Sequence, residues 1–279
     1  MGSMAETHTD ASFALRVVSG QGLYDEPIPE TSPLRARFVE RERLFQSSLM
    51  VAWQIQASRL ITLLRLKFPN KMKKTATKMS LGDQEFWDAW RAVYSPIVIQ
   101  FLSDAAEVGG SEALGFLAEI GIGLDMPVAR AVHQRWAVSH GLDLVRGMAV
   151  SDKRAIQAEL RVWLDTNEGF AGLVDRLNRI LRNVRRAELI AATESTNAFF
   201  NGNVQLWRES NVVVGKRWRT ATDERVCPIC SSLSETVVLL DEMFDTMIGP
   251  LDGPSAHPGC RCWVVPVITS QMPGAEGAI

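Results

Sequence analysis

The residues of this chain best suited to chemistry are four cysteines and one histidine that stand together near its C-terminal end. They form two short motifs about 30 residues apart, Cys227-x2-Cys230 and His257-x2-Cys260-x-Cys262, and the chain has no other cysteine. Two motifs of this kind suit a tetrahedral zinc ion, because each turn presents two ligand atoms to one metal. The sequence therefore predicts a zinc site, with two disulfides or buried free thiols as the alternatives.

Five candidate ligands compete for four positions around such an ion. Cys227, Cys230 and His257 are the first three, and Cys260 completes a compact His-Pro-Gly-Cys turn. Cys262 follows two residues later and would point to the same side as Cys260 in an extended chain, so it remains the alternative fourth ligand. Disulfides are disfavoured because no secretory signal is visible, and disulfides are rare in a reducing compartment.

The metal is expected to be structural rather than catalytic. A catalytic zinc keeps one position open for water and usually has a Glu or His nearby to move protons. Base deaminases carry His-x-Glu ahead of Pro-Cys-x2-Cys. Here Val226 precedes Cys227, and none of the upstream histidines (His8, His133 and His140) has a Glu two residues on. The deaminase interpretation therefore fails.

Composition is that of an ordinary globular protein. The chain has 279 residues, of which 46% are hydrophobic and 22% charged, enough for one large domain or two moderate ones with a sizeable core. The net charge of -2 argues against a protein that coats nucleic acid over its whole surface, but leaves room for a local basic patch. Because no apolar run reaches the ~18–20 residues of a bilayer span, no membrane association is expected.

Helical periodicity dominates the chain before the cysteines. The predicted helices are 34–68, 80–107, 111–122, 127–149, 152–166, 170–184 and 186–211, the last two of which could run together. Gly109-Gly110 is predicted to break the chain, and Ser151 or Asp152 to cap the helix that follows it.

Alternating patterns replace the helical period after Gly215. The predicted strands are 216–221, 237–240 and 263–268. The expected fold class is therefore α+β, a mainly helical N-terminal body followed by a small β-rich module held by zinc. Residues 1–33 are polar and turn-rich and are expected to form a flexible arm, and residues 269–279 a frayed tail.

A group of arginines marks the predicted helices around residue 180, with spacings of three and four that put most of them on one face. They are Arg176, Arg179, Arg182, Arg185 and Arg186. Two interpretations remain open. The arginines form the solvated side of an amphipathic helix, or a basic ridge that contacts DNA or an acidic partner.

Three sequence blocks stand in order along the second half of the chain. Residues 187–195 are Ala-Glu-Leu-Ile-Ala-Ala-Thr-Glu-Ser, residues 218–230 are Trp-Arg-Thr-Ala-Thr-Asp-Glu-Arg-Val-Cys-Pro-Ile-Cys, and residues 257–262 are His-Pro-Gly-Cys-Arg-Cys. In their order and spacing these blocks resemble the phage head-morphogenesis (minor head) family, which includes the F protein of phage Mu. That family has Arg-Ala-x-x-Ile-Ala-Arg-Thr-Glu in the first block, so Ala192 replaces an arginine.

The resemblance covers residues 141–268 as a minor head domain and leaves 34–140 as a helical body without a matching motif. It implies a capsid protein present in few copies, with the portal protein and the major capsid protein as partners and double-stranded DNA as a further one. It places the protein in the virion head near the portal, after synthesis in the bacterial host cytoplasm. The motif residues Glu194, Trp218 and Asp223 are expected to be structural, with Glu194 paired to an arginine and Trp218 shielding the cysteines. The candidate arginines are Arg185, Arg186 and Arg219.

Two other function classes compete with this one. The family's domain has been likened to ADP-ribosyltransferase folds, which would make Glu194 the acid of a toxin or effector enzyme. The chain lacks the Gly-rich loop, catalytic His and second paired carboxylate that such an enzyme needs, so no enzyme is expected. A DNA-binding zinc module of a host regulator would need a basic recognition helix after the cysteines, whereas residues 231–256 are acidic and apolar.

Overall fold

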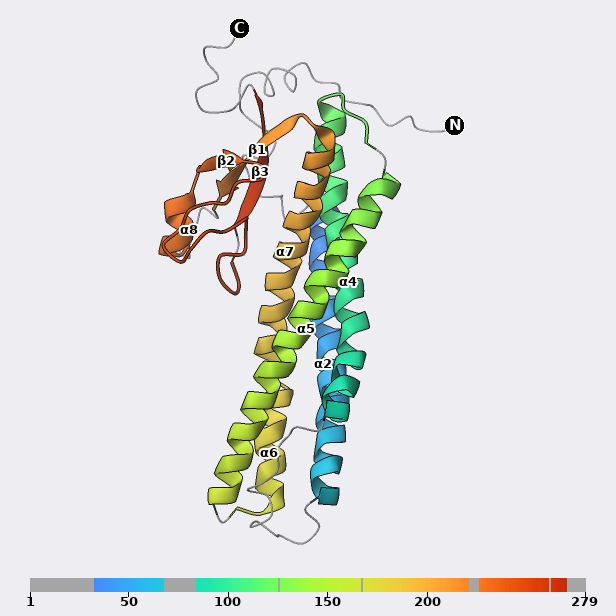
Figure 1. The fold of residues 1–279 in the computed structure, drawn as a ribbon, viewed down its shortest axis with the longest axis vertical. Coiled ribbons are helices and arrows are strands. Elements are labelled where there is room, and N and C mark those ends of the chain that lie inside the picture. Colours follow the sequence, from blue (N-terminus) through green and yellow to red (C-terminus); the bar gives the residue numbers. More distant parts are fainter. Residues whose placement is uncertain are drawn as a thin grey trace.

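Long helices arranged side by side make up most of the structure, and a small module lies against one side of them (Figure 1). The computed structural model describes residues 33–67, 84–124, 126–166, 168–220, 226–260 and 262–269. Its long helices are α2 (Pro33–Lys67), α4 (Gln84–Glu119), α5 (Met126–Asp165), α6 (Phe170–Leu181) and α7 (Val184–Ser210). Residues 1–32 of the expected arm, residues 270–279 of the expected tail, and Asp223 lie outside the described residues.

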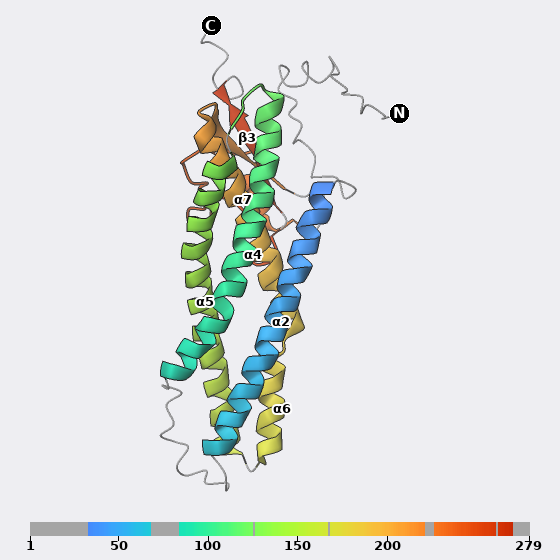
Figure 2. The same ribbon diagram turned by 90° about the vertical axis from the view of Figure 1, so that its right-hand side faces the viewer.

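The helices pack because each one buries an apolar stripe. On α2, Leu49, Trp53, Leu60 and Leu64 recur at helical spacing, and each is at most 1% exposed. Helix α4 lies centrally, in contact with α2, α5 and α7, and α6 packs against α5 and α2. Figure 2 shows α2, α4 and α5 side by side along the length of the bundle. Among the described residues, no helix has the length and apolar character that crossing a bilayer requires.

Helix α4 continues through Gly109-Gly110, so the predicted break at this pair was wrong. The glycines serve a close approach of two helices instead. A Cβ on Gly109 would lie 2.2 Å from the carbonyl oxygen of Phe199 in α7, and a Cβ on Gly202 of α7 would lie 2.0 Å from that of Ala106. The packing gained there offsets the cost of about 1 kcal/mol that each glycine adds within a helix.

Helix α5 likewise continues through Ser151-Asp152, where a helix start was predicted wrongly. The Asp152 side chain is fully buried and pairs with the Arg186 guanidinium, which also donates to the Ser151 hydroxyl at 2.9 Å. Arg186 lies over the Trp53 ring, 5.2 Å from its centroid. Asp152 thus connects α5 to α7 rather than capping a helix.

Helices α6 and α7 are separate, because the chain leaves the helical conformation after Leu181. Asn183 starts α7 as its N-cap, with its side-chain oxygen accepting from the Arg186 backbone N–H at 3.1 Å. At the other end Asn211 takes a left-handed conformation, which turns the chain directly from α7 into the first strand.

The C-terminal module contains an antiparallel sheet of three strands in the order β2-β1-β3. Its elements are β1 (Val213–Arg219), α8 (Pro228–Leu233), β2 (Val237–Leu239) and β3 (Trp263–Ile268). Gly215 of β1 pairs with Leu239 of β2 on one side and with Val267 of β3 on the other. A mainly helical body followed by a small module with a sheet is therefore confirmed.

Candidate metal centre

The five predicted ligands come together in the core of the module. Cys227, Cys230 and His257 form one group whose ligand atoms all lie within 4.8 Å of one another, and Cys230, Cys260 and Cys262 form a second such group. The Cys230 Sγ atom lies 3.7 Å from His257 Nε2 and 3.7 Å from Cys260 Sγ. Cys230 is therefore shared by both groups and lies at the centre of the cluster.

Local backbone geometry explains how the first cysteine pair faces inward. Cys227 is the N-cap of α8, and its sulfur accepts from the Cys230 backbone N–H at 3.4 Å. Pro228 occupies the first turn of that helix, where a missing N–H costs nothing. The short helix thus places both sulfurs on the same side.

The second group of ligands lies on a tight turn. The Cys260 N–H donates to the His257 carbonyl at 3.0 Å, and Gly259 has a φ of 75° that favours glycine. The Nδ1 atom of His257 lies 3.1 Å from the Pro258 carbonyl oxygen. A proton on Nδ1 would be donated there, which leaves the Nε2 lone pair free toward Cys230.

These separations fit a tetrahedral zinc ion. Zinc–sulfur bonds of about 2.3 Å at tetrahedral angles put two sulfurs about 3.8 Å apart, and a sulfur and an imidazole nitrogen about 3.6 Å apart. Both Cys230 separations, at 3.7 Å, agree with those values. Five donors remain for four positions, so Cys260 and Cys262 are still alternatives for the fourth ligand.

The thiols lie in surroundings that change their acidity. The hydrogen bond with Cys262 lowers the pKa of Cys260 to about 5, whereas burial raises the pKa of Cys230 to about 12. Cys230, Cys260 and Cys262 are each under 10% exposed. No disulfide joins the four cysteines in the structure. A bound cation would stabilise their thiolates, because the thiolate is the form that coordinates a metal.

Aromatic side chains share the buried core with the cysteines. Trp218 and Phe244 are fully buried and meet edge to face with ring centroids 5.1 Å apart. Together with Leu233, Ala256 and three of the cysteines they make up the buried core around the cluster. So small a core gives little stability alone, which is the usual reason for a structural metal.

The loop that carries His257 is attached to α7 by hydrogen bonds. The Gly259 N–H donates to Thr193 Oγ1 at 3.2 Å, and the backbone N–H and hydroxyl of Ser255 both donate to Asn197 Oδ1, at 3.1 and 3.0 Å. Thr193 and Asn197 are one turn apart on the same face of α7. The Thr-Glu segment singled out in the sequence is thus part of the surface on which the metal loop rests.

A buried lysine makes a further connection between the module and α7. Lys216 of β1 is fully buried, and its ammonium pairs with Asp252. The same ammonium lies 5.8 Å from the centroid of the Phe200 ring of α7 and 5.7 Å from that of Phe244. Pairing and two ring faces compensate the burial of this charge.

Glu194 connects helices rather than pairing with an arginine, so the expected partner was wrong. Its Oε2 atom lies 2.7 Å from His140 Nε2 of α5 and accepts from Asn197 Nδ2 at 3.3 Å. Arg186 forms an ion pair with Asp152 instead, and Arg219 forms one with Glu235. The hydrogen bond with Glu194 raises the pKa of His140, against the effect of burial.

The five arginines do not form one ridge. Arg176 pairs with Glu168 at 2.8 Å and Glu159 at 3.2 Å, and Arg186 points at Asp152. The remaining three are exposed on either side of the break between α6 and α7. They are Arg179, Arg182 and Arg185.

Sequence reasoning missed the residues that attach the site to the bundle. Asn197 contacts Ser255 across 58 positions and His140 contacts Glu194 across 54, without any local pattern to signal either pair. The sequence predicted only that Lys216 belongs to a strand. Its burial against Phe200 depends on how the sheet packs on α7.

Residues 155–265 match the family model described as Phage Mu protein F like protein. The matched segment begins within α5 and ends within β3, so it includes α7 and all five candidate ligands. No match to the chain was found among curated proteins or among solved structures. The match confirms the resemblance carried by the three sequence blocks, and it supports a place for this chain in a phage head-morphogenesis family.

Proposed function

We propose that this protein is a structural component of a phage head, in which a long helical bundle carries a small zinc-held module on its side. The observation that carries the proposal is the match of residues 155–265 to the Phage Mu protein F like model. This segment contains both the candidate metal centre and the face of α7 to which the metal loop is attached. The hydrogen bonds between this loop and α7 fix the module on the bundle, as suits a structural component.

Zinc would be held by Cys227, Cys230 and His257, with Cys260 in the fourth position and Cys262 as the alternative. Its role here is to join α8 to the loop before β3, two segments about 30 residues apart in the chain. The burial of Cys230, Cys260 and Cys262 supports a closed structural site rather than one open to a substrate.

The protein is proposed not to be an enzyme. The runner-up function, a transferase with Glu194 as its acid, would need that carboxylate to face a substrate. Glu194 is only 8% exposed, and His140 and Asn197 occupy the same oxygen of its carboxylate. Incubation of the purified chain with NAD should give no turnover. Turnover that Glu194→Gln abolishes in a folded variant would establish the transferase function instead.

Association with head components can be tested by co-expression. The full chain, produced with the portal protein and major capsid protein of the same phage, should co-purify with assembled heads. Removal of residues 1–32 should weaken this association while the module stays folded. Deleting α2 is not a useful variant, because Leu49, Trp53 and Leu64 belong to the bundle core. A chain absent from heads whose portal is fully assembled would contradict the proposal.

DNA contact is proposed for the three arginines that remain exposed, Arg179, Arg182 and Arg185. Such contact should be weak, independent of sequence and strongly reduced by salt, because it depends on counterion release. Replacing all three by Gln should abolish retention of duplex DNA at low salt. Arg146→Gln, which changes an exposed arginine of α5, is the matched control. Equal binding by the triple variant and the control would exclude these arginines.

A further inference from the structure

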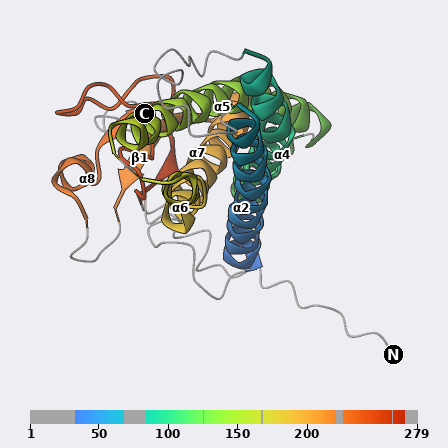
Figure 3. The same ribbon diagram turned by 90° about the horizontal axis from the view of Figure 1, so that it is seen from below.

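The metal loop, which carries His257, runs along one face of α7 in the direction opposite to the helix. The module lies on the side of α7 that faces away from α2, in the views of both Figure 1 and Figure 3. Three contacting pairs follow one another along the loop: Gly253 with Phe200, Ser255 with Asn197, and Gly259 with Thr193. Because the α7 members are three or four residues apart, they share one face. His257 lies midway between the last two contacts.

The side-chain amide of Asn197 has one favourable orientation. Its Oδ1 atom accepts from the Ser255 backbone N–H at 3.1 Å and from the Ser255 hydroxyl at 3.0 Å. Its Nδ2 atom donates to Oε2 of Glu194 at 3.3 Å. The reversed amide would place its NH2 group against the Ser255 N–H and its oxygen against the Glu194 carboxylate, and both arrangements repel. Glu194 thus holds the acceptor atom of Asn197 toward the loop.

Glu194 is itself fixed from α5. The same Oε2 atom lies 2.7 Å from His140 Nε2, and the His140 ring stacks on the Trp136 ring with centroids 4.9 Å apart. Glu194 is buried, so little water competes for its oxygens. A line of contacts therefore connects α5 to the metal loop, from Trp136 through His140, Glu194 and Asn197 to Ser255.

Thr193 provides a second acceptor, one turn before Asn197 on α7. Its hydroxyl donates to the Leu189 carbonyl at 2.7 Å, so its oxygen can accept the Gly259 N–H, which lies at 3.2 Å. Gly259 directly precedes Cys260, and His257 is two residues from either anchored N–H. Both ligands of the turn are thus held close to a backbone group that α7 binds.

We propose that Asn197 and Glu194 are positioning residues of the metal centre. Asn197 holds the loop at Ser255, and Glu194 orients the Asn197 amide for this contact. The inference rests on the metal centre of the proposed function and adds that the bundle sets its affinity for zinc. A loop already held in its bound conformation loses less entropy when its ligands bind the ion. Hydrogen bonds that support metal ligands change metal affinity by roughly 10–100-fold.

Zinc affinity of the full chain, measured at one pH by competition with a coloured chelator, tests this role. Asn197→Ala removes the acceptor of both Ser255 donors and should weaken zinc binding about tenfold or more. Thr193→Val, a change to a side chain of nearly the same size, removes the acceptor for the Gly259 N–H and should weaken binding as well. Helical circular dichroism should show that the bundle of both variants remains folded.

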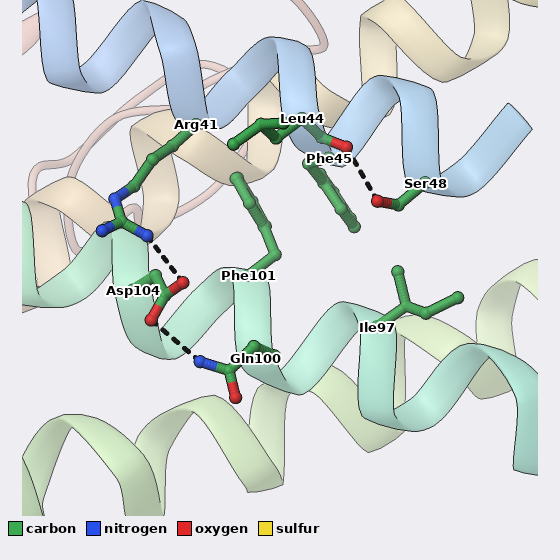
Figure 4. A pocket seen from close by; sticks show the side chains of 8 residues that line it. All are labelled: Arg41, Leu44, Phe45, Ser48, Ile97, Gln100, Phe101 and Asp104. Carbon is green, nitrogen blue, oxygen red and sulfur yellow. Dashed lines mark hydrogen bonds and ion pairs between the residues drawn. The ribbon is translucent and has the colours of Figure 1, made fainter.

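Gln100→Ala is the matched control. The Gln100 side-chain amide donates to Asp104 Oδ1 at 2.9 Å, so this change also removes an amide that a helix holds against a carboxylate (Figure 4). Gln100 lines a pocket between α2 and α4 rather than the surface under the metal loop. Zinc affinity should therefore equal that of the wild type.

An exchange of the two side chains separates positioning from general stability. Asn197→Asp alone places a second carboxylate beside Glu194 and should weaken zinc binding about tenfold. In the double variant with Glu194→Gln, the new amide can donate to one oxygen of the new carboxylate, whose other oxygen accepts from Ser255. Affinity should then return to within about threefold of the wild type. A general loss of stability would not be reversed by a second change.

The outcomes distinguish two kinds of failure. A wild-type chain that binds no zinc overturns the metal centre and this inference together. A zinc-binding wild type whose affinity Asn197→Ala leaves unchanged overturns the inference alone. So does a double variant that binds zinc no better than Asn197→Asp, because Glu194 then does not orient the amide. None of these results depends on the assembly of heads.

Discussion

Cys230 and Glu194 hold the C-terminal half of this protein together, each through side chains that come from distant segments. The Cys230 sulfur is common to both groups of metal donors, and Glu194 joins α5 to the helix that bears the metal loop. The five donors could be predicted because ligand spacing is a local property of sequence. The partners of Glu194 could not, since opposite charge alone favoured an arginine and only the packing of α5 on α7 selects His140.

The central place of Cys230 predicts different effects for different cysteine changes. Wild-type protein purified without chelator should contain about one zinc per chain. Cys230→Ser should lose it, because both donor groups then lack a member. If Cys260 is the fourth ligand, Cys260→Ser should lose the metal while Cys262→Ser keeps it, as measured by elemental analysis. A fully folded wild-type chain without metal would refute the site.

The His140–Glu194 contact predicts a pH-dependent contribution to stability. The pKa of His140 is raised in the folded state, so this contribution is fully present below the unfolded pKa of about 6.5 and is lost as the pH rises through the folded pKa. His140→Gln should therefore lower the free energy of unfolding by about 1–2 kcal/mol near pH 6, and by less near pH 9.

The comparison of variant and wild type at each pH removes the effects of other buried groups. Burial lowers the pKa of His133 and raises that of Glu112 to about 7, so both influence the stability of either protein. If the free energies of unfolding of wild type and His140→Gln differ by the same amount at pH 6 and pH 9, the His140–Glu194 pair is not charged in the folded state.

At the scale of elements, the backbones of α4 and α7 come into close contact where the two helices cross. The backbones touch where Gly109 and Gly202 stand, and the His133 imidazole of α5 fills the space beside Gly110. The helices themselves were largely predicted from their apolar stripes. The breaks at Gly109-Gly110 and Ser151-Asp152 were wrong because a glycine pair and an aspartate resemble helix ends locally, whereas their packing partners lie far away in the chain.

The crossing predicts opposite effects for two Gly→Ala changes. Gly202→Ala should destabilise the protein by about 1–3 kcal/mol, because its Cβ would overlap the Ala106 carbonyl oxygen. Gly147→Ala on α5, where a Cβ meets nothing within 4 Å, should stabilise it by roughly 0.5–1 kcal/mol. Urea unfolding of both variants measures the difference. A Gly202→Ala variant as stable as the wild type would mean that the helices separate at the crossing at little cost.

For the whole molecule, the bundle core and the core around the cysteines are separate, and a second cluster with residues of α4, α7 and β1 joins the two parts. Helix α7 contributes Ala187, Ala191 and Ala198 to the bundle core and Phe200 and Val204 to a second cluster that includes Val213 of β1. The sequence predicted this order of parts from the change of period after Gly215. It could not predict the orientation of the module, which depends on contacts with α7 such as that of Lys216 with the Phe200 ring.

Metal removal should therefore affect the two parts unequally. Chelation should leave the helices α2 to α7 protected against amide hydrogen exchange, because their core contains none of the metal ligands. Residues 226–260 should lose protection, since the binding energy of a structural metal is folding energy. Exchange measured by mass spectrometry, before and after zinc is restored, provides the readout. Uniform loss of protection across both parts would show that the bundle depends on the metal.

The position of the two ligand pairs also sets the order in which the site is completed during synthesis. The ribosome delivers Cys230 before Cys262, which follows 32 positions later in the chain. At about 5–20 residues per second, this interval lasts roughly two to six seconds. By then α7 has emerged, and the bundle can fold with Thr193 and Asn197 already in place. The last candidate ligands thus arrive at a surface that is already folded, so capture of a metal ion at this site would come after the bundle has formed.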